Sequence, residues 1–167
     1  MRVLICGSRK WTAEGPVREF VAALPEGCVV IEGAARGADR IAAHAARDRG
    51  LEVEAYPADW ARFGPKAAGP IRNRAMLTQG HPEQVWAFCD DLAGSRGTKD
   101  MVEAGLAAGL PVWVVDSSGA TTRLSRSPDR ELRLPFPNSD MWVRLLRLGS
   151  PDPRSFRAGG TGVYARR

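Results

Sequence analysis

The stretch "CVVIEGAARGADRIAAHAARDRG", residues 28–50, contains one complete strand, loop and helix pattern. Its first four residues form an apolar run that is typical of a buried strand, and a glycine-containing loop follows. From residue 40 onward the apolar side chains recur on one helical face, and Gly50 is a typical residue at which a helix ends. The stretch therefore predicts one βα unit.

The same alternation recurs through residues 1–116. We expect strands at 2–6, 28–31, 51–56, 85–88 and 112–115, and helices at 17–24, 40–49, 72–79 and 98–108. Strands that alternate with helices run parallel, because each helix carries the chain back across the sheet. The sequence thus predicts a Rossmann-like α/β fold, with a mostly parallel five-stranded sheet and helices on both faces.

The composition changes near Asp116, after which Ser, Thr, Arg and Pro become frequent. Residues 121–167 contain ten Lys and Arg against four Asp and Glu, a net charge of +6 in a chain whose total is +5. We therefore expect two parts, a ligand-binding domain over 1–116 and a basic, Arg- and Pro-rich extension over 117–167. Within the extension, "MWVRLLRL" (141–148) is typical of a short amphipathic helix that docks on the body or on another subunit.

Several classes of protein are disfavoured by what the chain lacks. No apolar run approaches the roughly 20 residues of a membrane span, and the apolar start is too short for a secretory signal. The three cysteines have no CxxC spacing and lie in or beside apolar runs, as reduced core cysteines do. We expect a cytoplasmic protein that binds no membrane, metal or cofactor.

Three expected strand ends carry glycines and polar side chains. In an open parallel sheet, ligands bind beyond the carboxyl ends of the strands, where helix N-termini attract anions. The candidate ligand-binding residues are Gly7, Ser8 and Arg9 after the first strand, Gly33, Gly37 and Asp39 after the second, and Gly94, Ser95, Gly97 and Thr98 after the fourth. In the plainer alternative, the glycines only make tight turns and Thr98 only caps its helix.

A long connection, "YPADWARFGPKAAGPIRNR" (56–74), adds candidates of another kind. Trp60 can stack on a base, Asp59 can accept a hydrogen bond from a ribose hydroxyl, and Arg72 can meet a phosphate. Arg72 and Arg74 point about 200° apart on a helix, so we expect only Arg72 to face the ligand. Alternatively, the aromatic side chains fold the loop onto the body and the arginines face solvent.

Five motifs in order carry a resemblance to a known family: "CGSR", "EGAARGAD", "PADW", "GPKAAGPIRNRAM" and "GSRGTKDMV". On these motifs, residues 1–116 resemble the SLOG superfamily, specifically its YspA-like branch (DUF2493). The resemblance implies a Rossmann-like domain that binds nucleotides or nucleotide-derived ligands. Related branches include the LOG-type phosphoribohydrolases and the DNA-processing protein A of natural transformation.

The resemblance to the LOG type also implies roles for individual residues. The Arg-Lys pair of its helix falls on Arg72 and Asn73, and its glycine loop falls on residues 93–98. Its glutamate, however, falls on Met101. Asp100, one position earlier, is the candidate catalytic acid, and the other acids nearby in sequence are Glu103, Asp90 and Asp91. Adjacent helical residues are turned by about 100°, so Asp100 does not simply replace a glutamate at 101.

The sequence leaves two classes of function open. It also does not decide whether the protein is an enzyme. In the first, the domain binds a nucleotide-type ligand as a sensor, a carrier or a weak processing enzyme, with LOG-like N-glycosidic hydrolysis of nucleoside monophosphates as the alternative. In the second, the C-terminal arginines bind nucleic acid. We also expect a homo-oligomer, of which a dimer is the simplest form.

Overall fold

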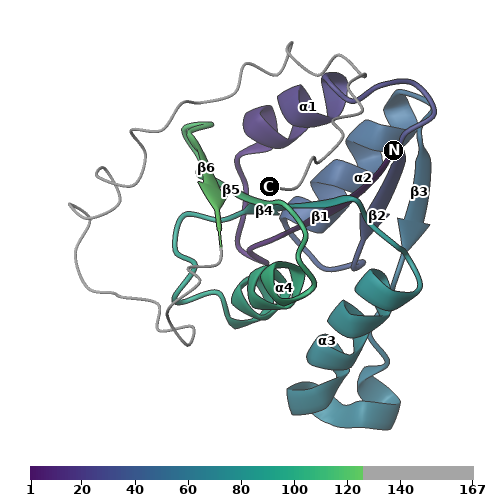
Figure 1. Cartoon of the computed structure of the whole chain (residues 1–167), viewed down its shortest axis with the longest axis vertical. Coiled ribbons are helices and arrows are strands. Elements are labelled where there is room, and N and C mark those ends of the chain that lie inside the picture. Colours follow the sequence, from purple (N-terminus) through teal and green to yellow (C-terminus); the bar gives the residue numbers. More distant parts are fainter. Residues whose placement is uncertain (126–167) are drawn as a thin grey trace, which may run out of the picture.

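The computed structural model describes residues 1–125, which form a six-stranded sheet with four helices (Figure 1). The elements are β1 (Arg2–Gly7), α1 (Glu14–Ala22), β2 (Val29–Glu32), α2 (Ala38–Asp48), β3 (Glu52–Ala55), α3 (Trp60–Thr78), β4 (Gln84–Phe88), α4 (Arg96–Ala107), β5 (Val112–Val115) and β6 (Thr121–Leu124).

The strand order is β3-β2-β1-β4-β5-β6, and the first five of these strands are parallel. The chain moves outward from β1 to β3 and then crosses back to pair β4 with the other side of β1. This reversal is the topological switch point of a Rossmann-type sheet, beside which ligands bind in such folds. The predicted fold class is confirmed.

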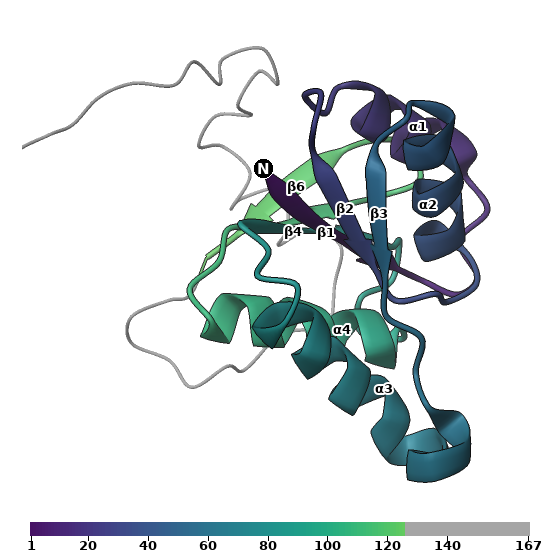
Figure 2. The ribbon, with the colours of Figure 1, turned by 90° about the vertical axis from the view of Figure 1, so that its right-hand side faces the viewer.

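Each face of the sheet is covered by one pair of helices (Figure 2). Side chains alternate along β1, so Val3 and Ile5 pack with α1 and α2, while Leu4 and Cys6 pack against the residues of α3 and α4. All four of these side chains are buried. The strands are apolar on both faces, as expected for a parallel sheet between two helical layers.

The number of strands was wrong in the sequence prediction. A sixth strand, β6, pairs antiparallel with β5 at the edge of the sheet, with Val115 opposite Thr121. Its sequence, TTRL, has no continuous apolar run because an edge strand buries little surface. The sheet therefore continues beyond residue 116, where the sequence placed the end of the first domain.

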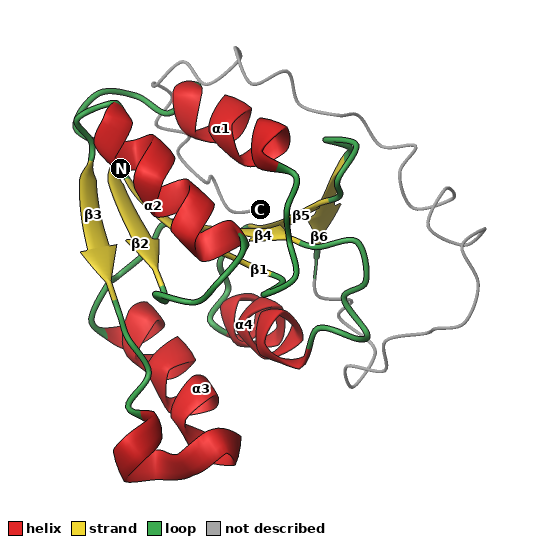
Figure 3. Cartoon of the chain, turned by 180° about the vertical axis from the view of Figure 1, so that it is seen from behind, coloured by secondary structure: helices red, strands yellow, loops and turns green. Residues whose placement is uncertain are grey.

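The start of α3 also differs from the prediction of a helix over 72–79. The helix begins at Trp60, and Gly64, with φ 68° and ψ 175°, makes a kink inside it. Pro65 follows the kink directly, at a position where a proline's missing N–H costs little because a first turn has free N–H groups. Figure 3 shows the bent first part of α3 extending beyond the edge of the sheet.

Other predictions fall outside the described residues. The helix expected over 141–148 and most of the basic extension lie beyond residue 125. In the part of the chain that the structure describes, none of the helices has both the length and the apolar character needed to cross a bilayer.

Candidate functional site

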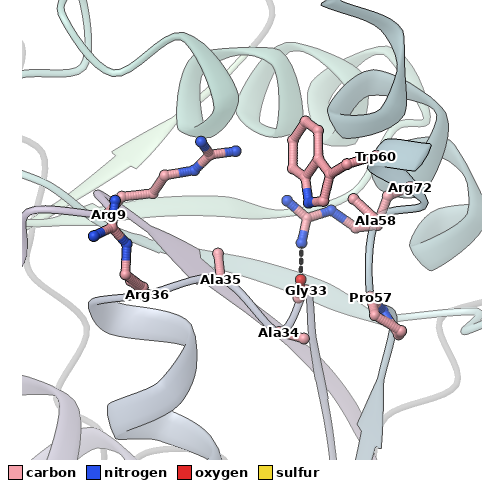
Figure 4. A pocket seen from close by; sticks show the side chains of 9 residues that line it. All are labelled: Arg9, Gly33, Ala34, Ala35, Arg36, Pro57, Ala58, Trp60 and Arg72. Carbon is pink, nitrogen blue, oxygen red and sulfur yellow. Dashed lines mark hydrogen bonds between the residues drawn. The ribbon is translucent and has the colours of Figure 1, made fainter. Parts of the chain in front are cut away.

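A cavity of about 340 Å³ lies beyond the carboxyl ends of the strands in the β1–β3 half of the sheet (Figure 4). It is lined by Arg9, Gly33, Ala34, Ala35, Arg36, Pro57, Ala58, Trp60 and Arg72. These residues come from the β1–α1 loop, the β2–α2 loop, the β3–α3 loop and α3. Four of the predicted binding residues thus meet there: Arg9, Gly33, Trp60 and Arg72.

Arg72 is held in the wall of this cavity by two of its three nitrogen atoms. Its Nη1 donates to the carbonyl oxygen of Gly33 and lies 3.8 Å from the Asp39 carboxylate, and its Nε donates to Asn73 Oδ1 at 3.0 Å. The Arg72 side chain is only 10% exposed. Its Nη2 makes no hydrogen bond to any of residues 1–125, so it is available to a ligand in the cavity.

The cavity lining also combines an aromatic ring with a cation. The Arg9 guanidinium lies 5.1 Å from the centre of the Trp60 ring, a cation–π distance. Trp60 remains 44% exposed, so its indole is accessible to a planar ligand. Figure 4 shows both side chains directed to the same side of the Gly33–Arg36 loop. Asp59 directly precedes α3 and caps its first turn, because its Oδ1 accepts a hydrogen bond from the Arg62 N–H at 2.9 Å.

Two buried carboxylates lie beneath the β2–α2 loop. Glu32 accepts a hydrogen bond from the Ala34 N–H at 2.7 Å, and Asp39 accepts one from the Gly33 N–H at 3.1 Å. Burial raises the pKa of Asp39 to about 7, with Arg72 opposing the rise, and burial also raises the pKa of Glu32. The Gly33 and Ala34 N–H groups are therefore already occupied and are not available to an anion.

The glycines of this loop permit close approach, but the approaching groups belong to the chain itself. A Cβ on Gly33 would overlap the Arg72 guanidinium. A Cβ on Gly37, which has φ 79°, would overlap the carbonyl oxygen of Ser8 in the first loop. Gly37 therefore packs the β1–α1 and β2–α2 loops together behind the cavity.

The third predicted loop ends at the N-terminus of α4. Ser95 Oγ and Thr98 Oγ1 are hydrogen-bonded to each other at 2.7 Å, and the Gly94 N–H donates to Asp91 Oδ1 at 2.9 Å. The first turn of α4 has no acidic residue, and no side chain caps its N–H groups. Unlike the β2–α2 loop, this helix start keeps the features that attract an anion.

Asn73 joins α3 to this helix start. Its Nδ2 donates to the Gly97 carbonyl oxygen at 3.2 Å and to Asp100 Oδ2 at 2.7 Å, and the side chain is buried. Asn73 neighbours Arg72 in sequence and accepts from its Nε. One asparagine thus connects the arginine of the cavity with the α4 loop.

The candidate acid Asp100 is engaged within the protein. Besides Asn73, its two oxygens accept from both terminal nitrogens of Arg74, at 3.0 and 3.1 Å. Met101, where the LOG pattern has its glutamate, is fully buried in the core beneath α4. The side chain at position 101 therefore faces the sheet and not a ligand.

Sequence reasoning missed two contributors, Glu32 and Arg36. Arg36 lies between Gly33 and Gly37, and its position in a glycine-containing loop was a signal that could have found it. Burial of Glu32 follows from tertiary packing, and the sequence carries no signal for it. Within residues 1–125, no three His, Cys, Asp or Glu side chains are grouped so as to hold a metal ion.

This geometry defines the class of the protein, a Rossmann-type α/β protein with a cavity at the carboxyl edge of its sheet. The model of the YspA, cpYpsA-related SLOG family (YAcAr) matches residues 1–63. The Gene 61 protein of Mycobacterium phage D29 is 40% identical over 120 residues, which span 66% of this chain and 93% of the phage protein. The chain belongs to this SLOG family.

The fold is also shared with a solved structure. The X-ray structure of DNA processing protein A from Streptococcus pneumoniae matches with a TM-score of 0.54 and 22% sequence identity. The match covers 68% of this chain and 50% of the pneumococcal chain, so this chain spans half the length of that protein. At this level of identity the likeness concerns the fold.

Proposed function

We propose that this protein binds a nucleotide or a nucleotide-derived ligand in the cavity at the carboxyl edge of its sheet. The observation that carries the proposal is Arg72, which lines the cavity with a nine-tenths buried side chain whose Nη2 makes no hydrogen bond to any of residues 1–125. Burying an arginine is costly, and its two held nitrogens fix the direction of the third. A phosphate oxygen is the acceptor that suits such a donor.

The other cavity residues support the same ligand chemistry. Trp60 offers an accessible indole on which a base stacks, at about 5 Å from the cation of Arg9. Neither Arg9 nor Arg36 forms an ion pair with a carboxylate of residues 1–125. Three guanidinium groups around one cavity favour an anionic ligand with a planar ring. Membership of the SLOG family supports a role with nucleotides or DNA in general.

The N-terminus of α4 is the second place where we expect the ligand's phosphate groups to bind. Its free N–H groups at Arg96–Thr98 lie beside the Gly97 carbonyl that Asn73 holds. A phosphate placed there would gain the helix dipole and backbone hydrogen bonds together.

We favour a protein that binds the nucleotide-type ligand without efficiently hydrolysing its N-glycosidic bond. Asp100 is bound by Asn73 and Arg74, and Met101 is a core residue. A sensor or a carrier needs the cavity and its arginines but no acid at position 101.

A second candidate function is nucleic-acid binding, favoured by the charge of +6 over residues 121–167. The likeness to a DNA processing protein points the same way. This function is tested by measuring affinity for an oligonucleotide at several salt concentrations. The affinity should fall steeply as the salt concentration rises, and it should be unchanged in the Arg72→Ala variant. Formation of a homo-oligomer is a further prediction, which light scattering on the full chain measures.

The decisive experiment is a thermal-shift panel of nucleoside mono-, di- and triphosphates, followed by calorimetry and product analysis on each hit. We expect at least one compound to stabilise the full chain, and Arg72→Ala to remove the effect. If no nucleotide stabilises the wild type at millimolar concentration, the proposal is wrong.

A further inference from the structure

We infer that Asp39 is a proton-linked positioning residue, which holds Arg72 and the β2–α2 loop in place and takes up a proton when an anion binds to Arg72. The inference rests on the proposed function and adds a regulation to the same site. Asp39 does not line the cavity, so it acts on the ligand through Arg72 and the loop.

Asp39, Gly33 and Arg72 form a closed set of contacts. Asp39 Oδ2 accepts from the Gly33 N–H at 3.1 Å, the Gly33 carbonyl accepts from Arg72 Nη1, and Nη1 lies 3.8 Å from Asp39 Oδ2. The Asp39 and Arg72 side chains are 3% and 10% exposed. Because both side chains are shielded from solvent, a change of charge on one strongly affects the other.

The charged and titratable neighbours of Asp39 come from each element packed around it. Glu32 at the end of β2 is a second buried carboxylate, and Arg72 of α3 is the buried cation beside both. Cys6 of β1 stays a neutral thiol, because burial raises its pKa well above the ordinary value. From the β1–α1 loop, Arg9 is directed to Trp60. Asp39 therefore depends mainly on the positive charge of Arg72, whereas the pKa of Glu32 is held down first by the Ala34 N–H and by Arg47, and then by Arg72.

An anion that binds to Arg72 partly offsets that charge. Burial already brings the pKa of Asp39 to about 7, and the Arg72 guanidinium is the main group that holds it from rising further. When an anion neutralises this effect, the carboxylate becomes harder to keep ionised, and it takes a proton from solvent. Proton uptake on binding means that affinity falls as the pH rises above about 7. If anion binding raises the pKa of Asp39 by one unit, the affinity for the anion would fall about tenfold in total as the pH rises.

The probe for this inference is inorganic sulfate, which stays a dianion between pH 6 and 9 and adds no titration of its own. Nuclear magnetic resonance of the full chain can follow the Arg72 Nε and Gly33 amide signals, which report binding. The Asp39 carboxyl carbon reports its own titration. We expect this carbon to titrate near pH 7 without sulfate and at a higher pH with saturating sulfate. We also expect sulfate affinity to fall about tenfold between pH 6 and pH 8.5.

Two variants complete the test. Asp39→Asn keeps a hydrogen-bond acceptor for the Gly33 N–H but cannot titrate, so its sulfate affinity should not change over this range. Asp48→Asn, at the exposed far end of α2, is the matched control and should keep the wild-type pH dependence. The titration of the Asp39 carboxyl carbon is measured in the wild type. It therefore tests the inference even if Asp39→Asn does not fold.

The outcomes separate this inference from the proposed function. Sulfate that shifts the Arg72 signal with a pH-independent affinity, or that leaves the Asp39 titration unmoved, overturns the inference alone. If neither sulfate nor any nucleotide shifts the Arg72 signal at any pH, the proposed function fails and the inference fails with it.

Discussion

Arg74 and Asp100 form a two-pronged ion pair, with Nη1 and Nη2 of the guanidinium 3.0 and 3.1 Å from the two carboxylate oxygens. The pair joins α3 to the first turns of α4 on the outside of the protein. The pair also distinguishes the roles of Arg74 and Arg72, which lie on the same helix. Arg74 is engaged at the surface, whereas Arg72 points to the cavity.

Substitution of these two arginines should therefore have unequal effects. Arg72→Ala should weaken binding of a nucleotide hit roughly ten- to a hundredfold, because a charged hydrogen bond contributes about 1.5–3 kcal/mol. Arg74→Ala, the matched control, should change affinity less than about fivefold, since exposed ion pairs contribute at most about 1 kcal/mol. Calorimetric titration of both variants checks this, and equal effects would show that the arginines were assigned wrongly.

Trp60→Ala should reduce affinity for a base-bearing ligand but not for sulfate. Stacking of one base on an aromatic ring contributes about 1–3 kcal/mol, which corresponds to a loss of roughly five- to a hundredfold. Phe63→Ala is the control, because Phe63 lies on the same helical segment, is 38% exposed and does not line the cavity. Titrations with a nucleoside monophosphate and with sulfate distinguish the two ligand parts. An equal loss for both ligands would mean that the indole shapes the site without stacking.

Gly97→Val tests the N-terminus of α4. A Cβ at Gly97 meets no atom within 4 Å, so the protein has room for a side chain and should fold. The added isopropyl group would nevertheless stand beside the free N–H groups of the helix start. We expect nucleotide binding to be lost or reduced at least tenfold, with an unchanged circular dichroism spectrum. If binding is intact, the phosphate does not bind at this helix.

Much of the fold could be predicted from local patterns. The apolar runs at 28–31 and 112–115 and the glycines after the strands are local features of the sequence. The sequence alone therefore indicates a parallel sheet with loops at one edge. The start of α3 could not be predicted in this way, because Gly64-Pro65 and Gly69-Pro70 have the composition of a loop. The kink at Gly64 places Pro65 in a first turn, where a proline is tolerated, whereas Pro70 lies inside the helix.

The sequence predicted which kinds of residues lie at the candidate site, but it predicted less well what each of them contacts. Glycines and arginines at strand ends indicate an anion site, and four of the expected residues do line the cavity. Asp39, however, reads from sequence as a ligand contact in a first helical turn. Its actual contacts with the Gly33 N–H and Arg72 depend on how α3 packs against the β2–α2 loop, which no local pattern encodes.

Buried Asp39 should also make the stability of the protein depend on pH. Its folded-state pKa of about 7 lies above the ordinary value of 3.8, so the folded protein holds this proton more tightly than the unfolded chain. The contribution is fully present below pH 3.8 and is lost as the pH rises through 7, a change of roughly 4 kcal/mol. Denaturant unfolding between pH 5 and 8 should show a free energy that falls with pH, less steeply in Asp39→Asn. A wild-type profile that rises over this range would contradict the assignment.

Hydrolysis of nucleoside 5′-monophosphates should be weak or absent in the purified protein. Asp100 is the candidate acid in the first turns of α4, but its oxygens are bound by Asn73 and Arg74, and loss of a general acid or base lowers a rate by about 10²–10⁴-fold. Chromatography of the reaction mixture measures release of the free base. Robust release that Asp100→Asn abolishes would overturn this view and make Asp100 the catalytic acid.

Met101→Glu is the converse test of hydrolysis, because it restores the glutamate that the LOG pattern has at this position. Met101 is fully buried in the core beneath α4, so a glutamate there would be a buried charge without a partner. We expect Met101→Glu to lower the melting temperature strongly and to release no base, whereas Met101→Leu should leave stability and ligand binding nearly unchanged because it conserves volume. Thermal melts of both variants, with base release measured below their transitions, check this. If Met101→Glu is stable and gains base release, the side chain at position 101 reaches the ligand, and the orientation of α4 described above is wrong.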